Sequence, residues 1–300
     1  MKIVNIIGGL GNQMFQYAFA LSLKERFPDS VVKIDTSHFH YIFLKKWKTA
    51  NLHNGYEIDQ LFPNANLEKA SILDLLHVTW YVPNYWLSRF FRKVLPLRKT
   101  EYIQSSMICT SYDEKAYKQS DNCYYEGYWQ SITFYLPIRE KIKNIFKHPI
   151  PNSINANYIE KISMANSVGI HIRRGDYLLS PEFRGICTLD YYKKGIDEIL
   201  KDGEKHSFYI FSNDVDWCKD NICPLLHSHD CHIVTENKGK DSCWDMFLMT
   251  YCKDLIIANS SFSWWGAFLN DRGGRVVAPK KWDNKNRELD FWAPDWIKIN

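Results

Sequence analysis

The chain has 300 residues, of which 45% are apolar and 24% charged, and its formal net charge is +4. These proportions exclude a disordered or fibrous chain, and the mild charge, without a long basic run, excludes a typical nucleic-acid-binding surface and fits a small anionic ligand. Because 300 residues exceed what one core usually holds, two domains of about 150 residues are expected. The eight cysteines form no Cys-x-x-Cys pair, which favours reduced thiols in a cytoplasmic setting over a disulfide framework.

The first 35 residues predict a βαβ unit. A β-rich run at 3–7 leads into a glycine-rich turn at 8–13, a helix at 14–27 and a second strand at 31–35. The opening apolar run is too short for a secretory signal peptide. Nowhere do 18 apolar residues run together, so no membrane-spanning helix is expected.

The region 36–167 shows no regular alternation, and its architecture is not predicted. Within it, segment 80–99 mixes aromatic residues with five cations. This segment is either an interfacial membrane contact or, more ordinarily, a solvated helix face with its own core stripe. The Pro- and Asn-containing stretch 149–153 is the best candidate for a domain boundary. We therefore predict domains at 1–150 and 151–300, with a final helix packing back on the first.

A regular alternation of strands and helices returns after residue 166. Helical patterns at 190–201 and 242–252 alternate with short apolar runs that predict strands at 167–172, 207–212, 231–234, 254–258 and 275–278. Strands alternating with helices predict a parallel sheet covered on both faces, and the lack of polar alternation within the strands agrees.

Ligands of open parallel sheets bind at the carboxyl ends of the strands, and two such ends carry unusual residues. After the strand at 167–172 come Arg173, Arg174 and Gly175, and two adjacent guanidinium groups can clamp a phosphate bidentately. After the strand at 254–258, Asn259 leads into a serine-rich helix start, where free N–H groups and the helix dipole favour an anion. Alone, each could be a surface ion-pair network or an ordinary helix cap. Together they favour a phosphate site.

Three further clusters leave alternatives open. Asp214 and Asp216 follow the strand at 207–212 and could hold a divalent metal, although the two arginines could neutralise a diphosphate without one. The turn at 8–11, with Asp35 ending the next strand, resembles a nicotinamide-cofactor site, but the third glycine of that motif is Met14. A group of potential zinc ligands matches no zinc-finger spacing, so structural roles are favoured for Cys218, Cys223, His227, His229, Cys231 and His232.

Three motifs together resemble the bacterial α-1,2-fucosyltransferase family, which is similar to glycosyltransferase family 11. They are Gly-Gly-Leu-Gly-Asn-Gln-Met-Phe-Gln-Tyr at 8–17, His-Ile-Arg-Arg-Gly-Asp-Tyr at 171–177 and Asn-Ser-Ser-Phe-Ser-Trp-Trp-Gly at 259–266. The resemblance spans nearly the whole chain. It implies an α/β fold of the GT-B class, with two Rossmann-like domains facing a cleft. It also implies a metal-independent, inverting transfer of L-fucose from GDP-β-L-fucose to the 2-hydroxyl of a terminal galactose.

The resemblance also implies roles for individual residues. Arg173 is the expected principal diphosphate ligand, with Arg174 beside it, and His171 is the expected nucleoside contact. Asp176 is either the general base or a partner that orients the arginines. The full set of expected donor-binding residues is Gly11, Asn12, His171, Arg173, Arg174, Asn213, Ser260, Ser261, Phe262 and Ser263. The loop that holds Asn12 is expected to close over the cleft.

No cofactor is expected, since GDP-fucose is a co-substrate, and no metal is expected either. The expected partners are GDP-fucose and a galactose-terminated oligosaccharide, lipid-linked or free, with a peripheral contact to the inner membrane as a further expectation and no nucleic acid. Two other functions stay open at this point. One is an NAD-dependent oxidoreductase built on the first βαβ unit, and the other is a non-catalytic nucleotide- or glycan-binding module.

Overall fold

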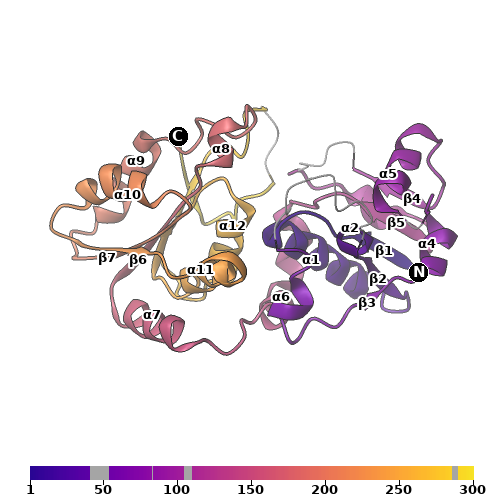
Figure 1. Ribbon diagram of the computed structural model, residues 1–300, viewed down its shortest axis with the longest axis horizontal. Helices are drawn as coiled ribbons and strands as arrows, with labels where there is room; N and C mark the ends of the chain where they lie inside the picture. Colours follow the sequence, from indigo (N-terminus) through magenta and orange to yellow (C-terminus); the bar gives the residue numbers. More distant parts are fainter. Residues whose placement is uncertain (41–53, 83, 105–109, 286–289) are drawn as a thin grey trace. The chain divides into compact units, whose positions relative to one another are not determined.

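A computed structural model describes residues 1–40, 54–82, 84–104, 110–285 and 290–300. The chain divides into two compact units, Met1–Pro149 with Glu288–Phe291, and Ile150–Arg287 with Trp292–Asn300. Each unit contains one parallel sheet with helices (Figure 1). The predicted α/β class with two Rossmann-like domains is confirmed.

The first unit holds a five-stranded sheet in the order β3-β2-β1-β5-β4. Its strands are β1 (Lys2–Asn5), β2 (Val32–Asp35), β3 (Glu68–Lys69), β4 (Glu101–Ile103) and β5 (Cys123–Glu126). Its helices are α1 (Leu10–Arg26), α2 (Ser37–His40), α3 (Ile58–Leu61), α4 (Ile72–Val78), α5 (Tyr85–Val94) and α6 (Arg139–Ile145). Short 3₁₀ turns lie at η1 (Glu114–Lys118), η2 (Ile132–Phe134) and η3 (Leu136–Ile138).

Helices cover both faces of this sheet. Successive residues of a strand point to opposite faces, so neighbouring residues of β5 contact different helices. On one face, Tyr125 of β5 makes an edge-to-face contact with Phe19 of α1. On the other face, the neighbouring Tyr124 packs with Leu75 and Val78 of α4. The sheet is therefore covered on both faces, and all four residues of β1 are buried.

The glycine-rich opening forms a shorter turn than the sequence predicts. Helix α1 begins at Leu10, not at Met14, because the Gly9 carbonyl already accepts the N–H groups of residues 12 and 13 at 2.9 and 3.0 Å. The turn itself is confined to Gly8 and Gly9, and Gly8 has a φ of +81°, a region in which side chains are disfavoured. The residues of the motif after Gly9 are therefore helical.

The second unit holds a six-stranded parallel sheet in the order β11-β10-β9-β6-β7-β8. Its strands are β6 (Ser167–Ile172), β7 (Ser207–Ser212), β8 (Asp230–Val234), β9 (Asp254–Ile256), β10 (Val276–Pro279) and β11 (Ile297–Ile299). Its helices and 3₁₀ turns are α7 (Ser153–Met164), α8 (Asp176–Leu179), α9 (Leu189–Leu200), α10 (Val215–Asn221), η4 (Cys223–Leu226), η5 (Gly239–Ser242), α11 (Cys243–Met249) and α12 (Ser261–Phe268).

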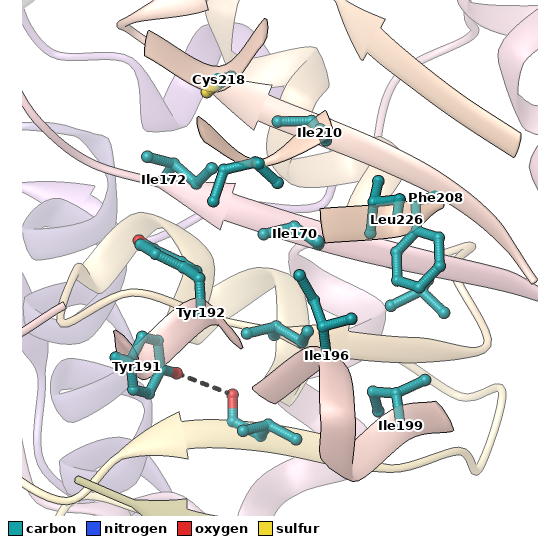
Figure 2. Packing of buried hydrophobic residues seen from close by; sticks show 14 residues of the cluster. Ile170, Ile172, Tyr191, Tyr192, Ile196, Ile199, Phe208, Ile210, Cys218 and Leu226 are labelled. Carbon is teal, nitrogen blue, oxygen red and sulfur yellow. Dashed lines mark hydrogen bonds between the residues drawn. The ribbon is translucent and has the colours of Figure 1, made fainter. Parts of the chain in front are cut away.

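The predicted strands of this half agree with the structure to within two residues. The predicted final helix is wrong, because the last described element is strand β11, which pairs in parallel with β10. The core beneath the sheet is formed by the buried side chains of α9, chiefly Tyr191, Tyr192 and Ile196, against Ile170 and Ile172 of β6 (Figure 2). This packing holds the carboxyl end of β6 in place.

Candidate active site

The predicted phosphate-binding residues lie at a topological switch point. After β6, the chain adds β7 and β8 on one side of it and then returns to add β9 on the other. The loops that follow β6 and β9 therefore diverge at the carboxyl edge of the sheet, which is where ligands of open α/β sheets bind. Residues 173–175 and 257–260 form these two connections, with His171 at the end of β6, Asp176 at the start of α8 and Ser261 at the start of α12.

His171 is the last but one residue of β6 and is 6% exposed. The Tyr192 hydroxyl donates a hydrogen bond to its carbonyl oxygen at 3.2 Å, and its ring lies 5.7 Å from that of Phe262. Burial, helped by the charge of Arg173, lowers the pKa of His171 to about 3. Its Nδ1 is buried and has no hydrogen-bond partner among the described residues, so the neutral imidazole carries an unused nitrogen.

Arg173 is the more available of the two arginines. Its Nη2 donates to Asp176 at 2.9 Å, and the two side chains are 35% and 59% exposed. Its guanidinium also lies 5.5 Å from the ring centre of Tyr177. An exposed ion pair of this kind contributes little to stability, which leaves Arg173 able to turn toward an anion.

Arg174 is anchored by its surroundings. Its Nε donates to Asp214 at 2.9 Å, its guanidinium lies 4.1 Å from the ring centre of Trp217, and its backbone N–H donates to Asn213 at 2.9 Å. The backbone is further constrained at Gly175, which has a φ of +53°. A Cβ on Gly175 would lie 2.8 Å from the Asn213 amide. Asn213 therefore shapes the loop from the neighbouring strand end.

The start of α12 offers backbone N–H groups at the same edge. Ser260 is its N-cap residue but makes no side-chain capping bond to any described residue, so the first N–H groups of the helix keep their capacity for an anion. The Ser263 hydroxyl is fully buried and donates to the carbonyls of Ala258 and Ser260, both at 3.3 Å. Its hydroxyl therefore stays within the helix start, whereas Ser261 and Phe262 are partly exposed.

Two supporting residues were missed by sequence reasoning. Asn259 is buried, donates through Nδ2 to the Trp282 carbonyl at 3.0 Å and accepts from the Cys187 thiol at 3.4 Å. These bonds hold the loop between β9 and α12. Trp217 supports the guanidinium of Arg174 from α10. The position of Asn259 directly after a strand is a signal that could have identified it, whereas nothing in the sequence distinguishes Trp217 from a core residue.

Asp214 and Asp216 bind different partners in the structure. Asp214 accepts from Arg174 and also caps α10 by accepting the N–H of Trp217 at 3.2 Å. Asp216 has a side chain that is 91% exposed and pairs with Lys219. Each carboxylate thus has a cationic partner in the structure.

One group of potential metal ligands does lie close together among the described residues, namely Asp202, His206 and Asp254. Arg275 binds both carboxylates, at 2.6 and 2.7 Å. The group surrounds the amino-terminal ends of β7 and β9, opposite to the predicted site. It is therefore a structural ion-pair network.

The cysteine and histidine cluster is structural, as the sequence favours. Cys218 belongs to the core that α9 covers, and burial raises its pKa to about 11. Cys231 lies in β8 with its Sγ 2.9 Å from that of Cys223, and burial also raises its pKa. None of the six residues belongs to the group of potential metal ligands that lies close together among the described residues.

Gly11 and Asn12 lie in the other unit, in the first turn of α1. The Asn12 Oδ1 accepts from Gln130 at 3.1 Å. Asn12 is therefore helical and does not lie in the turn that the sequence predicts at 8–13. The structure thus brings eight of the ten expected donor-binding residues to one edge of the second sheet and leaves these two in the first unit.

The same motif contains two buried glutamines that bind the backbone of distant loops. Gln13 donates to the carbonyls of Gly8 and Gly55 at 2.9 and 2.8 Å. Gln16 accepts the N–H of Ile7 at 2.8 Å and donates to the Gly127 carbonyl at 3.2 Å. These bonds give the glutamines of the opening motif a structural role.

Comparisons with known proteins extend over the whole chain. The family model described as Glycosyl transferase family 11 matches residues 2–300. An alpha-1,2-colitosyltransferase of Escherichia coli is 31% identical over 99% of this chain and 98% of its own length. A galactoside alpha-(1,2)-fucosyltransferase 1 of Lagothrix lagotricha is 27% identical over 58% of this chain and 51% of its own. The crystal structure of the fucosyltransferase NodZ from Bradyrhizobium is similar over 89% of this chain and 91% of that one, with 13% identity and a TM-score of 0.48.

Among the described residues, no helix is both long and apolar enough to cross a membrane.

Proposed function

The chain belongs to glycosyl transferase family 11, and from this membership and the site above we propose that it is an inverting α-1,2-fucosyltransferase. It transfers L-fucose from GDP-β-L-fucose to the 2-hydroxyl of a terminal galactose. The bond between the sugar C1 and the β-phosphate oxygen breaks while the galactose 2-oxygen bonds to C1 from the opposite face, and the proton of the 2-hydroxyl passes to water. The observation that carries the proposal is the position of the exposed Arg173 and the uncapped start of α12 on the two sides of one switch point.

The diphosphate is the part of the donor that this edge suits best. As the sugar leaves, negative charge grows on the β-phosphate, and groups that stabilise this charge accelerate the reaction. Arg173 supplies a mobile cation, the start of α12 supplies backbone N–H groups, and Arg174 supplies a second guanidinium held by Asp214. Of these, Arg174 and the start of α12 are preplaced, and donors of this kind need no reorganisation during the reaction.

His171 is proposed to contact the nucleoside. The imidazole is neutral at physiological pH, because burial lowers its pKa to about 3. Its Nδ1 is buried and has no partner among the described residues, so we propose that it bonds the base or ribose, without adding charge, once the bound nucleoside displaces the side chains that cover it.

Asp176 is proposed to orient Arg173. The 2.9 Å ion pair between them supports this role over the general base, since a carboxylate that is bound to a guanidinium is less free to take a proton. Turnover and GDP affinity of Asp176→Asn, measured together, would decide between the two roles. Weakened GDP affinity supports the orienting role, and intact affinity with lost turnover supports the base.

A second donor is favoured by one finding. One relative that matches nearly the whole of this chain is an alpha-1,2-colitosyltransferase, and colitose is L-fucose without its 3-hydroxyl. A pocket that hydrogen-bonds this hydroxyl discriminates against the deoxy sugar by about 10⁴-fold or more, because its polar groups are left unpaired. A pocket built for colitose discriminates much less against fucose, so the ratio of kcat/KM for the two GDP-sugars identifies the donor.

The test of the proposed function is GDP release from GDP-fucose with lactose as acceptor, in excess EDTA. We expect acceptor-dependent release, because Asp214 and Asp216 are each paired with a cation and the arginines neutralise the leaving group. Release that requires Mn²⁺ would overturn the metal-independent mechanism. No release with lactose, N-acetyllactosamine or other galactosides, but turnover of GDP-colitose, would assign the second donor.

A further inference from the structure

Helix α5 turns its polar side toward the protein. Its buried residues are Tyr85, Ser88 and Arg92. The Arg92 Nε donates to the buried carboxylate of Glu126 at 3.0 Å. The Ser88 hydroxyl accepts the N–H of Val82 at 3.0 Å and donates to its carbonyl at 2.9 Å. These bonds determine which side of the helix faces inward, because turning it would leave the Glu126 carboxylate buried without its partner.

The outward side of α5 is apolar as a consequence. Trp86, Leu87, Phe90 and Val94 are 50%, 45%, 56% and 58% exposed, and their spacing places them on one side of the helix. The interpretation of segment 80–99 as a solvated helix with an apolar core stripe is therefore wrong. The stripe exists, but it faces away from the core.

The apolar surface continues beyond the helix. Leu95 and Leu97 follow directly and are also exposed. The Trp80 indole N–H donates to the Pro96 carbonyl at 3.1 Å. Arg98 lies over the Trp80 ring and donates to the Leu76 carbonyl at 3.1 Å, next to the end of α4. The α5 surface, as we call it, consists of Leu76, Trp80, Trp86, Leu87, Phe90, Val94, Leu95 and Leu97, all of which are exposed.

The charged residues of segment 80–99, which forms most of the α5 surface, are all basic. Segment 80–99 contains five basic residues and no acidic residue. Of these, Lys93 and Lys99 are exposed beside the apolar side chains. Aromatic and aliphatic side chains flanked by lysines are typical of helices that lie in the interface of anionic bilayers. We propose that the α5 surface binds the protein peripherally to membranes rich in anionic phospholipids.

A bilayer fits this surface better than a second copy of the chain does. In a symmetric dimer, the same patch on both subunits is paired, so the lysines at 93 and 99 would meet like charges. Anionic headgroups would instead neutralise them. Lysine stems can lie along the apolar surface while their ammonium groups reach the headgroups.

The test is sedimentation of the full chain with vesicles of 30 mol % phosphatidylglycerol in phosphatidylcholine, compared with phosphatidylcholine alone. We expect binding to the anionic vesicles that weakens with added NaCl. The double variant Leu87→Gln/Phe90→Gln should reduce the partition coefficient at least about 10-fold, since two exposed apolar side chains no longer enter the interface. Removing both charges in Lys93→Gln/Lys99→Gln should cost about five-fold per lysine.

The matched control is Ile154→Gln/Met164→Gln, which replaces two apolar residues on α7 that are 50% and 83% exposed. It should bind vesicles like the unmodified chain. All variants should keep the melting temperature and turn over a free galactoside equally, which separates lost binding from lost folding. The proposal is overturned if the unmodified chain does not bind anionic vesicles, or if the α7 control loses as much binding. It is also overturned if the α5 variant abolishes self-association rather than vesicle binding.

Discussion

Arg173→Ala is the substitution that most directly tests the proposed site. Its side chain makes an exposed ion pair with Asp176 and lies over the ring of Tyr177. Removing it should hardly change the folded state, because exposed ion pairs contribute about 0–1 kcal/mol. We therefore expect the melting temperature to fall by about 2 °C or less.

The effect on turnover should be much larger. One charge-assisted hydrogen bond contributes about 1.5–3 kcal/mol, which corresponds to about 10- to 150-fold in rate. A guanidinium can make two such bonds to a diphosphate, so a loss of about 100-fold or more in kcat/KM is expected. Arg173→Lys keeps the charge but not the paired donors, and it should recover only part of this loss.

The assay combines GDP release kinetics, calorimetric GDP binding and thermal unfolding. Arg174→Ala is the matched control, because that arginine is held by Asp214 and stacks on Trp217. It should lose stability together with activity, whereas Arg173→Ala should lose activity alone. Near wild-type kcat/KM for Arg173→Ala would refute the assignment of the diphosphate site. So would a loss of activity that is matched by a loss of stability.

Three further predictions concern other residues. Gly175→Ala should lower the free energy of unfolding by about 1–3 kcal/mol and weaken GDP binding. The reason is that Gly175 has a φ of +53° and that a Cβ there would lie 2.8 Å from Asn213. An unchanged urea midpoint would contradict this prediction. Burial raises the pKa of Asp245 to about 7, so the stability that its protonated form contributes is present below its unfolded pKa of about 4 and is lost as pH rises through 7. Asp245→Asn should therefore raise the urea midpoint at pH 8 but not at pH 4, and equal effects at both would argue against a neutral buried carboxyl. Because burial and then the charge of Arg173 lower the pKa of His171 to about 3, calorimetric GDP affinity should show no transition that belongs to this histidine between pH 5 and 8. A transition near pH 6.5 that His171→Asn removes would show that the imidazole titrates in this range.

The two halves of the chain differ in how far their fold could be predicted. In the second half, β6 and β7 lie at their predicted residues, because buried parallel strands are short apolar runs between helices of clear period. In the first half, β4 and β5 have three and four residues, and β5 pairs with β1 from about 120 residues away. Strands so short and so distant from their partners leave no periodic signal in the sequence.

The residues of the proposed phosphate site could be identified from the sequence alone. The arginine pair at 173–174 and the serine-rich helix start at 260–263 each follow an apolar strand, and parallel strands bring their carboxyl ends to one edge. That rule suffices to predict a phosphate site without knowing the strand order. The motifs also sufficed to indicate the family, which the match over residues 2–300 confirms.

The contacts that each of these residues makes could be known only from the tertiary structure. Asp214 and Trp217 come from a different strand end and helix than Arg174, and their contacts distinguish an anchored arginine from the exposed Arg173. The orientation of α5 was decided in the same way, because the buried Glu126 of β5 draws the polar side of the helix inward. An amphipathic pattern records that a helix has two different sides. Which side is buried depends on the partners that the rest of the chain places beneath it.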